Sequence, residues 1–189
     1  MKELFTAGVD EVGRGCIAGP VVSAAVILKN SINLNLLKDS KKISFKKRVK
    51  ISEHIKNNSY FAIGVASVDE ILNLNILQAS LLSMKRAIKK LKVKPALTLI
   101  DGNFAPVGLK NFITITNGDE KIKVISAASI IAKVYRDKFM IKLSEKYSNY
   151  AWERNYGYGT KAHLEGLKKF GVTSHHRKGF KPVHKILSS

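Results

Sequence analysis

The stretch GVDEVGRGCIAGPVV, residues 8–22, sets two adjacent carboxylates against a glycine-rich segment. The apolar runs on either side of it are 4–9 (LFTAGV) and 20–28 (PVVSAAVIL). Both runs are short, rich in β-branched residues and bounded by glycine or proline, which is typical of strands. We therefore predict two neighbouring strands joined through the glycine-rich segment, with Asp10 and Glu11 near the end of the first.

The glycines of this segment do not form a nucleotide-binding loop. The segment lacks the Lys-Ser/Thr ending of a P-loop, and its third glycine comes one residue too late for G-x-G-x-x-G. Gly13 and Gly15 leave the backbone bare, and a bare peptide group offers both a donor and an acceptor, as a 2′-hydroxyl does. Two interpretations stay open at this point: a surface that touches a substrate sugar, or a tight turn between strands.

The rest of the chain alternates between helical and extended patterns around what we expect to be one main core. The expected elements are a basic helix from about Ser44, a strand over 60–68, a helix over 68–91 broken near Asn73 or Asn75, strands within 95–103 and 111–116, a helix over 124–147 and a short helix near 160–169. The weakest break in composition falls near Ser148, before a basic tail.

The composition points to a polyanionic partner. Lysine and arginine total 33 against 14 acidic residues, a net charge of +19, which favours nucleic acid first and an anionic membrane second. No apolar run reaches the roughly 18 to 20 residues of a membrane span, and the N-terminus resembles no signal peptide, so we predict a cytoplasmic protein. The single cysteine, Cys16, excludes an intrachain disulfide and a multi-cysteine zinc site.

Four carboxylates share a placement at or near the C-terminal end of an expected strand: Asp10, Glu11, Asp101 and Asp119. Converging carboxylates repel one another, so a site that holds several needs shared protons or a divalent cation. In so basic a protein, this favours a Mg²⁺ or Mn²⁺ site for phosphodiester chemistry, because oxygen ligands suit these hard ions. Each aspartate taken singly is also a common turn residue, so the hypothesis depends on the set.

The sequence leaves open how Asp10 and Glu11 are oriented and what Asp137 does. Alternation along a continuous strand directs Asp10 and Glu11 to opposite faces, so both enter one site only if the strand ends or bulges there. Asp137 lies in line with the apolar residues Ile130 and Val134 of the expected 124–147 helix, and a buried acid needs a partner or a function. A supporting role near the metals and an ion pair with a nearby lysine or arginine both remain open for it.

Motifs along nearly the whole chain resemble those of ribonuclease HII, the type 2 ribonuclease H family. In chain order they are DEVGRG followed by GPVV, DSKKIS, NILQAS, DGN, GD, SAASIIAKVYRD, GYGT..H and HR.GF. The resemblance implies an α/β fold of the ribonuclease H-like type, with a mixed central β-sheet flanked by helices and a C-terminal helical segment. It divides the chain into a catalytic core, 1–147, and an extension, 148–189, that packs on the core and contacts substrate.

The resemblance also implies an activity and its residues. The activity is endonucleolytic cleavage of RNA in RNA–DNA hybrids and 5′ to a single ribonucleotide in duplex DNA, leaving 5′-phosphate and 3′-hydroxyl ends. Asp10, Glu11, Asp101 and Asp119 resemble the family's metal-binding carboxylates, which hold two Mg²⁺ or Mn²⁺ ions, one activating water and the other stabilising the departing oxygen. Gly13, Arg14 and Gly15 resemble the element that touches the 2′-hydroxyl and the adjoining phosphate, and Tyr158 the tyrosine that stacks at the ribo–deoxyribo junction.

Several basic residues are candidates for backbone phosphates, which set affinity without reading sequence. They are Lys41, Lys42, Lys47, Lys133, Arg177, Lys178 and Lys181. We expect a monomer whose partner is nucleic acid and not a membrane. Two alternatives remain: a non-catalytic nucleic-acid-binding protein of the same fold, and another metal nuclease, such as an exonuclease or junction resolvase, that would not need the GRG segment.

Overall fold

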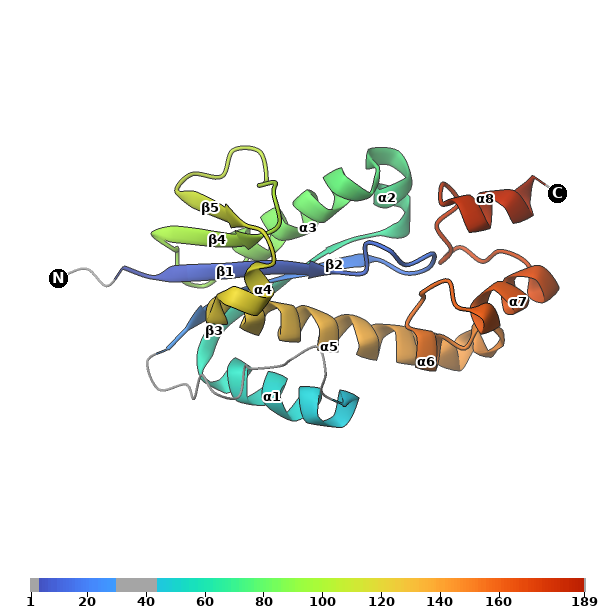
Figure 1. Cartoon of the computed structure of the whole chain (residues 1–189), viewed down its shortest axis with the longest axis horizontal. Helices are drawn as coiled ribbons and strands as arrows, with labels where there is room; N and C mark the ends of the chain where they lie inside the picture. The colour runs from blue at the N-terminus through green and yellow to red at the C-terminus, as the bar shows by residue number, and fades with distance from the viewer. Residues whose placement is uncertain (1–3, 30–43, 189) are drawn as a thin grey trace.

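The computed structural model describes residues 4–29 and 44–188, and within them one five-stranded mixed sheet lies between helices (Figure 1). The strand order is β3-β2-β1-β4-β5. β1 pairs antiparallel with β2 and parallel with β4; β2–β3 is antiparallel and β4–β5 is parallel. The strand bounds are β1 Thr6–Val12, β2 Val21–Leu28, β3 Ser59–Ala66, β4 Leu97–Asp101 and β5 Phe112–Ile115. The prediction of a mixed-sheet α/β fold is therefore confirmed.

Helices cover both faces of this sheet. α3 lies on one face, where Met84 and Ala87 pack with Val9 of β1. α1 and α5 lie on the other, where Ile55 and Ala127 join the apolar residues of β2 (Figure 1). The bounds are α1 Phe45–Asn57, α2 Val68–Leu74, α3 Ile76–Lys89, α4 Gly118–Lys121, α5 Lys123–Lys146, the 3-10 helix η2 Ser148–Tyr150, α6 Trp152–Asn155, α7 Lys161–Phe170 and α8 Lys181–Leu187. No helix in the described ranges is long and apolar enough to cross a membrane.

The longer elements follow the predictions made from periodicity and capping. Ser44 caps α1 through its side chain, which accepts from the Lys47 amide. The expected break between α2 and α3 falls at Asn75, whose φ of 70° no helix accommodates and whose side chain caps α3. The short helices α4, α6 and α8 were not predicted, because four to seven residues span too few turns to show a helical period.

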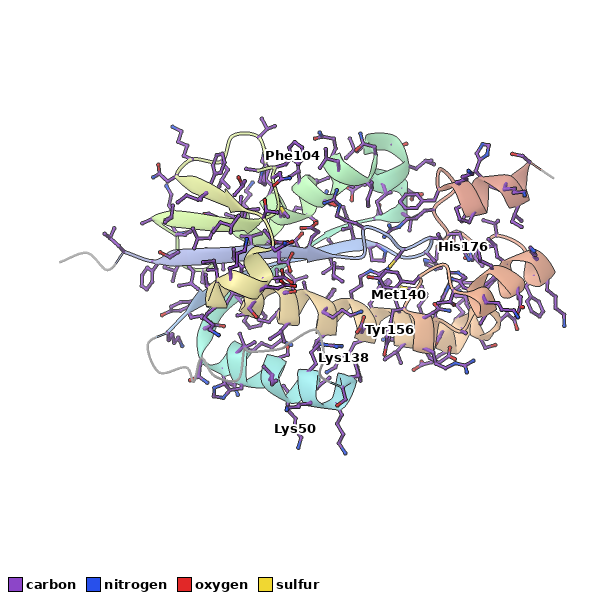
Figure 2. All side chains as sticks on the ribbon, viewed as in Figure 1. Lys50, Phe104, Lys138, Met140, Tyr156 and His176 are labelled. Carbon is purple, nitrogen blue, oxygen red and sulfur yellow. The ribbon has the colours of Figure 1, made fainter. Side chains whose placement is uncertain are left out.

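The C-terminal elements pack on one end of the core. Trp152, Leu167 and Val183 bury their side chains against Ala18 in the β1–β2 connection and Met140 near the end of α5. Figure 2 shows Met140 and His176 in the region where α5 meets the C-terminal segment. The later part of the β1–β2 connection, around Ala18, is therefore enclosed between α5 and the C-terminal helices.

The close contact of β3 with α3 makes a prediction about Gly64. A β-carbon at Gly64 would overlap the Ser83 carbonyl oxygen and lie 2.6 Å from the Ala87 amide nitrogen, so strand and helix would have to separate. We expect Gly64→Ala to lower the free energy of unfolding by about 1 to 3 kcal/mol in urea denaturation. The control is Gly179→Ala, whose β-carbon would make ordinary contact with Leu72 at 3.5 Å. Equal stability of the two variants would contradict this packing.

Candidate active site

The parallel pairing of β1 with β4 brings two aspartates to one edge of the sheet. Val9 lies opposite Ile100 in this pairing, so Asp10 and Asp101 are the next residues on neighbouring strands. Val9 and Ile100 both pack in the cluster with α3. Because side chains alternate along a strand, Asp10 and Asp101 project from the opposite face, toward α5. The prediction that these two strands present their carboxylates together is consistent with this geometry.

Asp119 is joined to the pair through Asp101. The Asp101 Oδ1 atom accepts hydrogen bonds from the backbone amides of Gly118, at 2.6 Å, and Asp119, at 3.4 Å. A β-carbon at Gly118 would lie 2.7 Å from Ile125 Cδ1, so the Ile125 side chain would have to shift if another residue stood here. Asp119 thus stands in the first turn of α4 and not at the end of β5, but the contact still brings it beside Asp101.

Glu11 does not meet the condition under which it would share a face with Asp10. β1 continues to Val12 with an unbroken register in which Glu11 pairs with Ser23, so the strand neither ends nor bulges at Glu11. Alternation then directs Glu11 away from the face that carries Asp10. Its Oε1 atom accepts from Arg14 at 3.2 Å, and its Oε2 atom is buried without a hydrogen-bond partner among the described residues.

Burial and mutual repulsion raise the pKa values of two of these carboxyls. The Asp10 pKa lies well above its usual value, chiefly because burial disfavours the charged form and also because Glu11 and Asp101 are near; a hydrogen bond from Ser129 lowers it in part. Burial likewise raises the Glu11 pKa, and Arg14 partly offsets this. A cation at this edge would relieve both effects.

The four carboxylates have the oxygen atoms that a hard divalent ion prefers, although they do not already surround one common point. In residues 4–29 and 44–188, no three His, Cys, Asp or Glu side chains form a ready metal-binding group. Glu11 instead takes Arg14 as partner and Asp101 takes the α4 amides. Oxygen-only donors, raised carboxyl pKa values and the unpartnered Glu11 Oε2 nevertheless fit Mg²⁺ or Mn²⁺. Binding would require Glu11 to turn from Arg14.

The two glycines of the GRG segment have different surroundings and therefore different structural roles. Gly13 is buried with a φ of 95°, and a β-carbon there would overlap the Arg136 Nε atom and lie 2.8 Å from its Cδ atom. Gly15 is exposed and has no atom within 4 Å of its missing β-carbon. Close approach of a substrate backbone therefore fits Gly15, whereas Gly13 makes room for a protein side chain. Arg14 stands between them with a half-exposed side chain.

Tyr158 lies beside the same segment on the C-terminal side. The residue is 40% exposed, and its ring centre lies 5.8 Å from the Lys133 Nζ atom, which is also 4.8 Å from the centre of the Tyr156 ring. Burial and the neighbouring Cys16 raise the Tyr158 pKa. An aromatic face this exposed is suited to stacking against a sugar or base.

Asp137 shows the ion-pair alternative. Its Oδ1 atom lies 2.8 Å from Lys133 Nζ and its Oδ2 atom 3.6 Å from Arg48 Nη1, and its side chain is fully buried. A supporting role for Asp137 beside the metals stays a prediction, since its ionic contacts run to Lys133 and Arg48. Through that lysine, Asp137 fixes a cation against the rings of Tyr156 and Tyr158.

The candidate phosphate contacts divide into exposed and buried residues. Lys47, Lys178 and Lys181 are exposed, as a phosphate contact requires. Arg177 is 1% exposed, so its assignment to a surface phosphate is wrong. Lys41 and Lys42 lie outside the described residues.

Comparison with known proteins gives a match over almost the whole chain. The family model described as ribonuclease HII matches residues 7–184. The chain belongs to the ribonuclease HII family. The ribonuclease HII of Pelagibacter ubique is 59% identical over 183 residues, covering 96% of this chain and 98% of its own, and that of Coxiella burnetii is 49% identical over 186 residues, covering 98% and 92%.

A solved structure agrees with this assignment. The ribonuclease H2 of Pyrococcus horikoshii superposes with a TM-score of 0.82 at 27% identity, covering 98% of each chain. The family identifies the chain as a nuclease that hydrolyses phosphodiester bonds, so the predicted family, fold and enzyme class are confirmed. A non-catalytic nucleic-acid-binding protein does not fit this result.

Sequence reasoning missed two residues that shape this ribonuclease HII site. Ser129 hydrogen-bonds Asp10, and Arg136 fills the space left by Gly13. Ser129 gave no signal, because small residues are common in helices that pack closely. Arg136 gave a weak one, as a charged residue next to the buried Asp137 on an apolar helix.

The raised pKa of Asp10 makes a prediction about stability and pH. A carboxyl whose pKa is higher in the folded than in the unfolded state destabilises the fold when ionised, so the cost is present above the folded pKa and disappears as pH falls below about 4. With chelator present, we expect Asp10→Asn to raise the free energy of unfolding by about 1 to 3 kcal/mol at pH 7.5. The difference should shrink toward pH 4 in thermal melts.

The matched control for this prediction is Asp69→Asn, an exposed carboxylate in the first turn of α2, which should give no stabilisation. If Asp10→Asn melts at or below the wild-type temperature at pH 7.5, Asp10 does not carry a destabilising buried charge.

Proposed function

We propose that this ribonuclease HII family member is an endonuclease that cleaves the RNA strand of RNA–DNA hybrids and cleaves 5′ to single ribonucleotides in duplex DNA. The products would carry 5′-phosphate and 3′-hydroxyl ends. The observation that supports this best is the placement of Asp10 and Asp101 on adjacent parallel strands, next to the GRG connection. The acidic ligands and the bare peptide groups then belong to one short segment, since Gly13 and Gly15 follow Asp10 by three and five residues.

The proposed ligands of divalent ions are Asp10, Glu11, Asp101 and Asp119. When bound, Mg²⁺ or Mn²⁺ would supply an activated water and stabilise the departing 3′ oxygen. The chain's own groups set up this site: Ser129 orients the Asp10 carboxylate, and the Gly118 amide orients Asp101. Arg14 holds Glu11 through a hydrogen bond that would exchange as Glu11 turns inward.

Selection for ribose would come from the GRG connection and Tyr158. The exposed peptide groups around Gly15 would exchange hydrogen bonds with the 2′-hydroxyl, while Tyr158 would stack at the junction with the following deoxyribose. A deoxyribose at this point leaves a buried polar group unpaired, which costs about 1 to 3 kcal/mol for each group. Lys133, held by Asp137, would add positive charge beside the tyrosine ring.

The extension over 148–189 would complete the substrate surface. Its helices pack on the β1–β2 connection, and its exposed Lys178 and Lys181 would contact backbone phosphates. The net charge of +19 supports binding to a polyanionic duplex. A monomeric state and a cytoplasmic location are part of this proposal.

A panel of duplexes tests the proposal. Labelled duplexes of DNA, RNA, RNA–DNA hybrid and DNA with one ribonucleotide are incubated with Mg²⁺, Mn²⁺ or chelator, and the products are sized and their ends mapped. We expect cutting of the hybrid's RNA and of the strand with the single ribonucleotide, only when metal is present. Asp101→Asn should abolish cutting, by at least about 10³-fold, because it removes a charged ligand at the reacting phosphate.

The control for Asp101→Asn is Asp69→Asn. It makes the same substitution in α2, outside the proposed ligand set, and this variant should cut normally. Cutting of all-DNA duplex, or full activity of Asp101→Asn, would refute the proposal. Release of mononucleotides from an end would instead identify an exonuclease.

A further inference from the structure

Two arginines lie deep inside the protein against the connection that carries GRG. Arg136, on α5, is 0% exposed, and Arg177, between α7 and α8, is 1% exposed. Together their guanidinium groups make five hydrogen bonds, and each ends on a backbone carbonyl oxygen. Within the part of the chain that the structure describes, neither forms a salt bridge with a carboxylate.

Arg136 joins the β1–β2 connection to the turn before Tyr158. Its Nε atom donates to Pro20 O at 2.9 Å and its Nη2 atom to Ala18 O at 2.9 Å. Its Nη1 atom donates to Tyr156 O at 2.7 Å. One rigid, planar group therefore fixes the distance between the segment that follows GRG and the segment that carries Tyr158.

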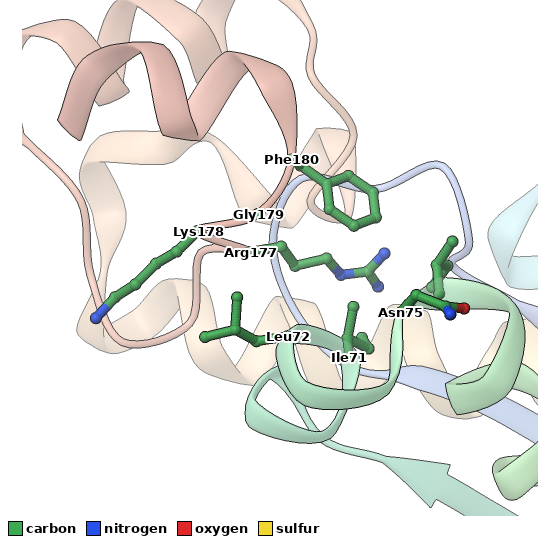
Figure 3. A pocket seen from close by; sticks show the side chains of 8 residues that line it. Ile71, Leu72, Asn75, Arg177, Lys178, Gly179 and Phe180 are labelled. Carbon is green, nitrogen blue, oxygen red and sulfur yellow. The ribbon is translucent and has the colours of Figure 1, made fainter. Parts of the chain in front are cut away.

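Arg177 holds the GRG segment itself. Its Nη1 atom donates to Arg14 O at 3.0 Å and its Nε atom to Gly19 O at 2.9 Å, so it ties together both ends of the connection. Its guanidinium carbon lies 5.2 Å from the centre of the Phe180 ring. Figure 3 shows the Arg177 side chain extending between Phe180 and Ile71, in a cavity of about 310 Å³.

This arrangement is unfavourable for stability alone. Burying a cation without an anion is costly, and two buried cations side by side repel each other. Burial and the neighbouring Arg136 lower the Arg177 pKa to about 10, which reflects that cost. Its Nη2 atom also has no hydrogen-bond partner among the described residues. Apolar side chains would avoid the buried charge but would leave these five carbonyl oxygens without their donors, so the arginines hold the segments that carry those carbonyls and do not only fill space.

We propose that Arg136 and Arg177 are positioning residues that hold the GRG peptide groups and Tyr158 in the one relative arrangement that recognises a ribonucleotide. This inference rests on the proposed function, because it assigns the sugar-reading role to these two segments. Neither arginine touches the substrate. Their fixed positive charge also lies behind the peptide groups that face the phosphate, where it strengthens the attraction for that anion.

Replacing either arginine should therefore slow the chemical step more than it weakens substrate binding. A displacement of about 1 Å at a reacting group costs on the order of 10²-fold in rate, while the exposed lysines that contact phosphates elsewhere are unaffected. A lysine in place of either arginine keeps the charge but replaces a planar fork with a single ammonium, so it cannot reproduce the paired bonds.

Kinetics of Arg136→Lys and Arg177→Lys on the duplex with one ribonucleotide test the inference. We expect kcat to fall about 10- to 100-fold with KM changed less than about 3-fold. The matched control is Arg154→Lys, an arginine on α6 with a 79% exposed side chain, which should keep wild-type values. All assays are run well below the lowest melting temperature, so that unfolding does not contribute.

Amide NMR and metal binding separate positioning from general damage. In Arg177→Lys, the resonances of Gly13, Gly15 and Tyr158 should shift and their hydrogen exchange should quicken, while the rise in melting temperature on adding Mn²⁺ should stay as in wild type. Unchanged kcat and unchanged amide signals in both lysine variants would overturn the inference. If the wild type cuts neither ribonucleotide-containing duplex, the proposed function fails, and the amide signals still decide whether the arginines hold these segments.

Discussion

The parallel pairing of β1 with β4 is the constraint on which the site depends. It places Asp10 and Asp101 side by side from segments some ninety residues apart, and the hydrogen bonds from the first amides of α4 to Asp101 bring the Asp119 backbone next to that pair. Close contacts make this possible: Gly118 lies against Ile125, and Gly8 of β1 has no room for a β-carbon beside Val124. The carboxylates at this edge of the sheet therefore repel one another, and they also concentrate negative charge there.

Positively charged side chains surround this acidic edge of the sheet. Two buried arginines lie behind the GRG connection, Lys133 lies against the Tyr158 ring, and lysines cover the outer surface. In the proposed complex, a phosphodiester would meet positive charge on its flanks and carboxylates at its centre. Divalent ions are the natural bridge between those carboxylates and the phosphate, since they bind both. The electrostatics of the site and its family assignment therefore support the same chemistry.

The sequence was sufficient where a signal was local or repeated. Period and capping located α1, α5 and the break at Asn75, and the motifs identified the family. It was insufficient where long-range contacts decide the outcome. The continuous register of β1 through Glu11 depends on its partner β2, and the burial of Arg177 depends on a connection about 160 residues away. A basic residue in a basic tail looks like a surface contact until its surroundings are known.

The most direct test of this account is an NMR pH titration of the Asp10 side-chain carboxyl in the wild type and in Asp101→Asn. The account predicts an Asp10 pKa well above the usual range for aspartate in the metal-free protein, because the group is buried beside two other carboxylates. That pKa should fall when Asp101 loses its charge, and fall again when Mg²⁺ is added to the wild type. An Asp10 that titrates in the usual range, and that responds neither to Asp101→Asn nor to Mg²⁺, would contradict the claim that these carboxylates form one site.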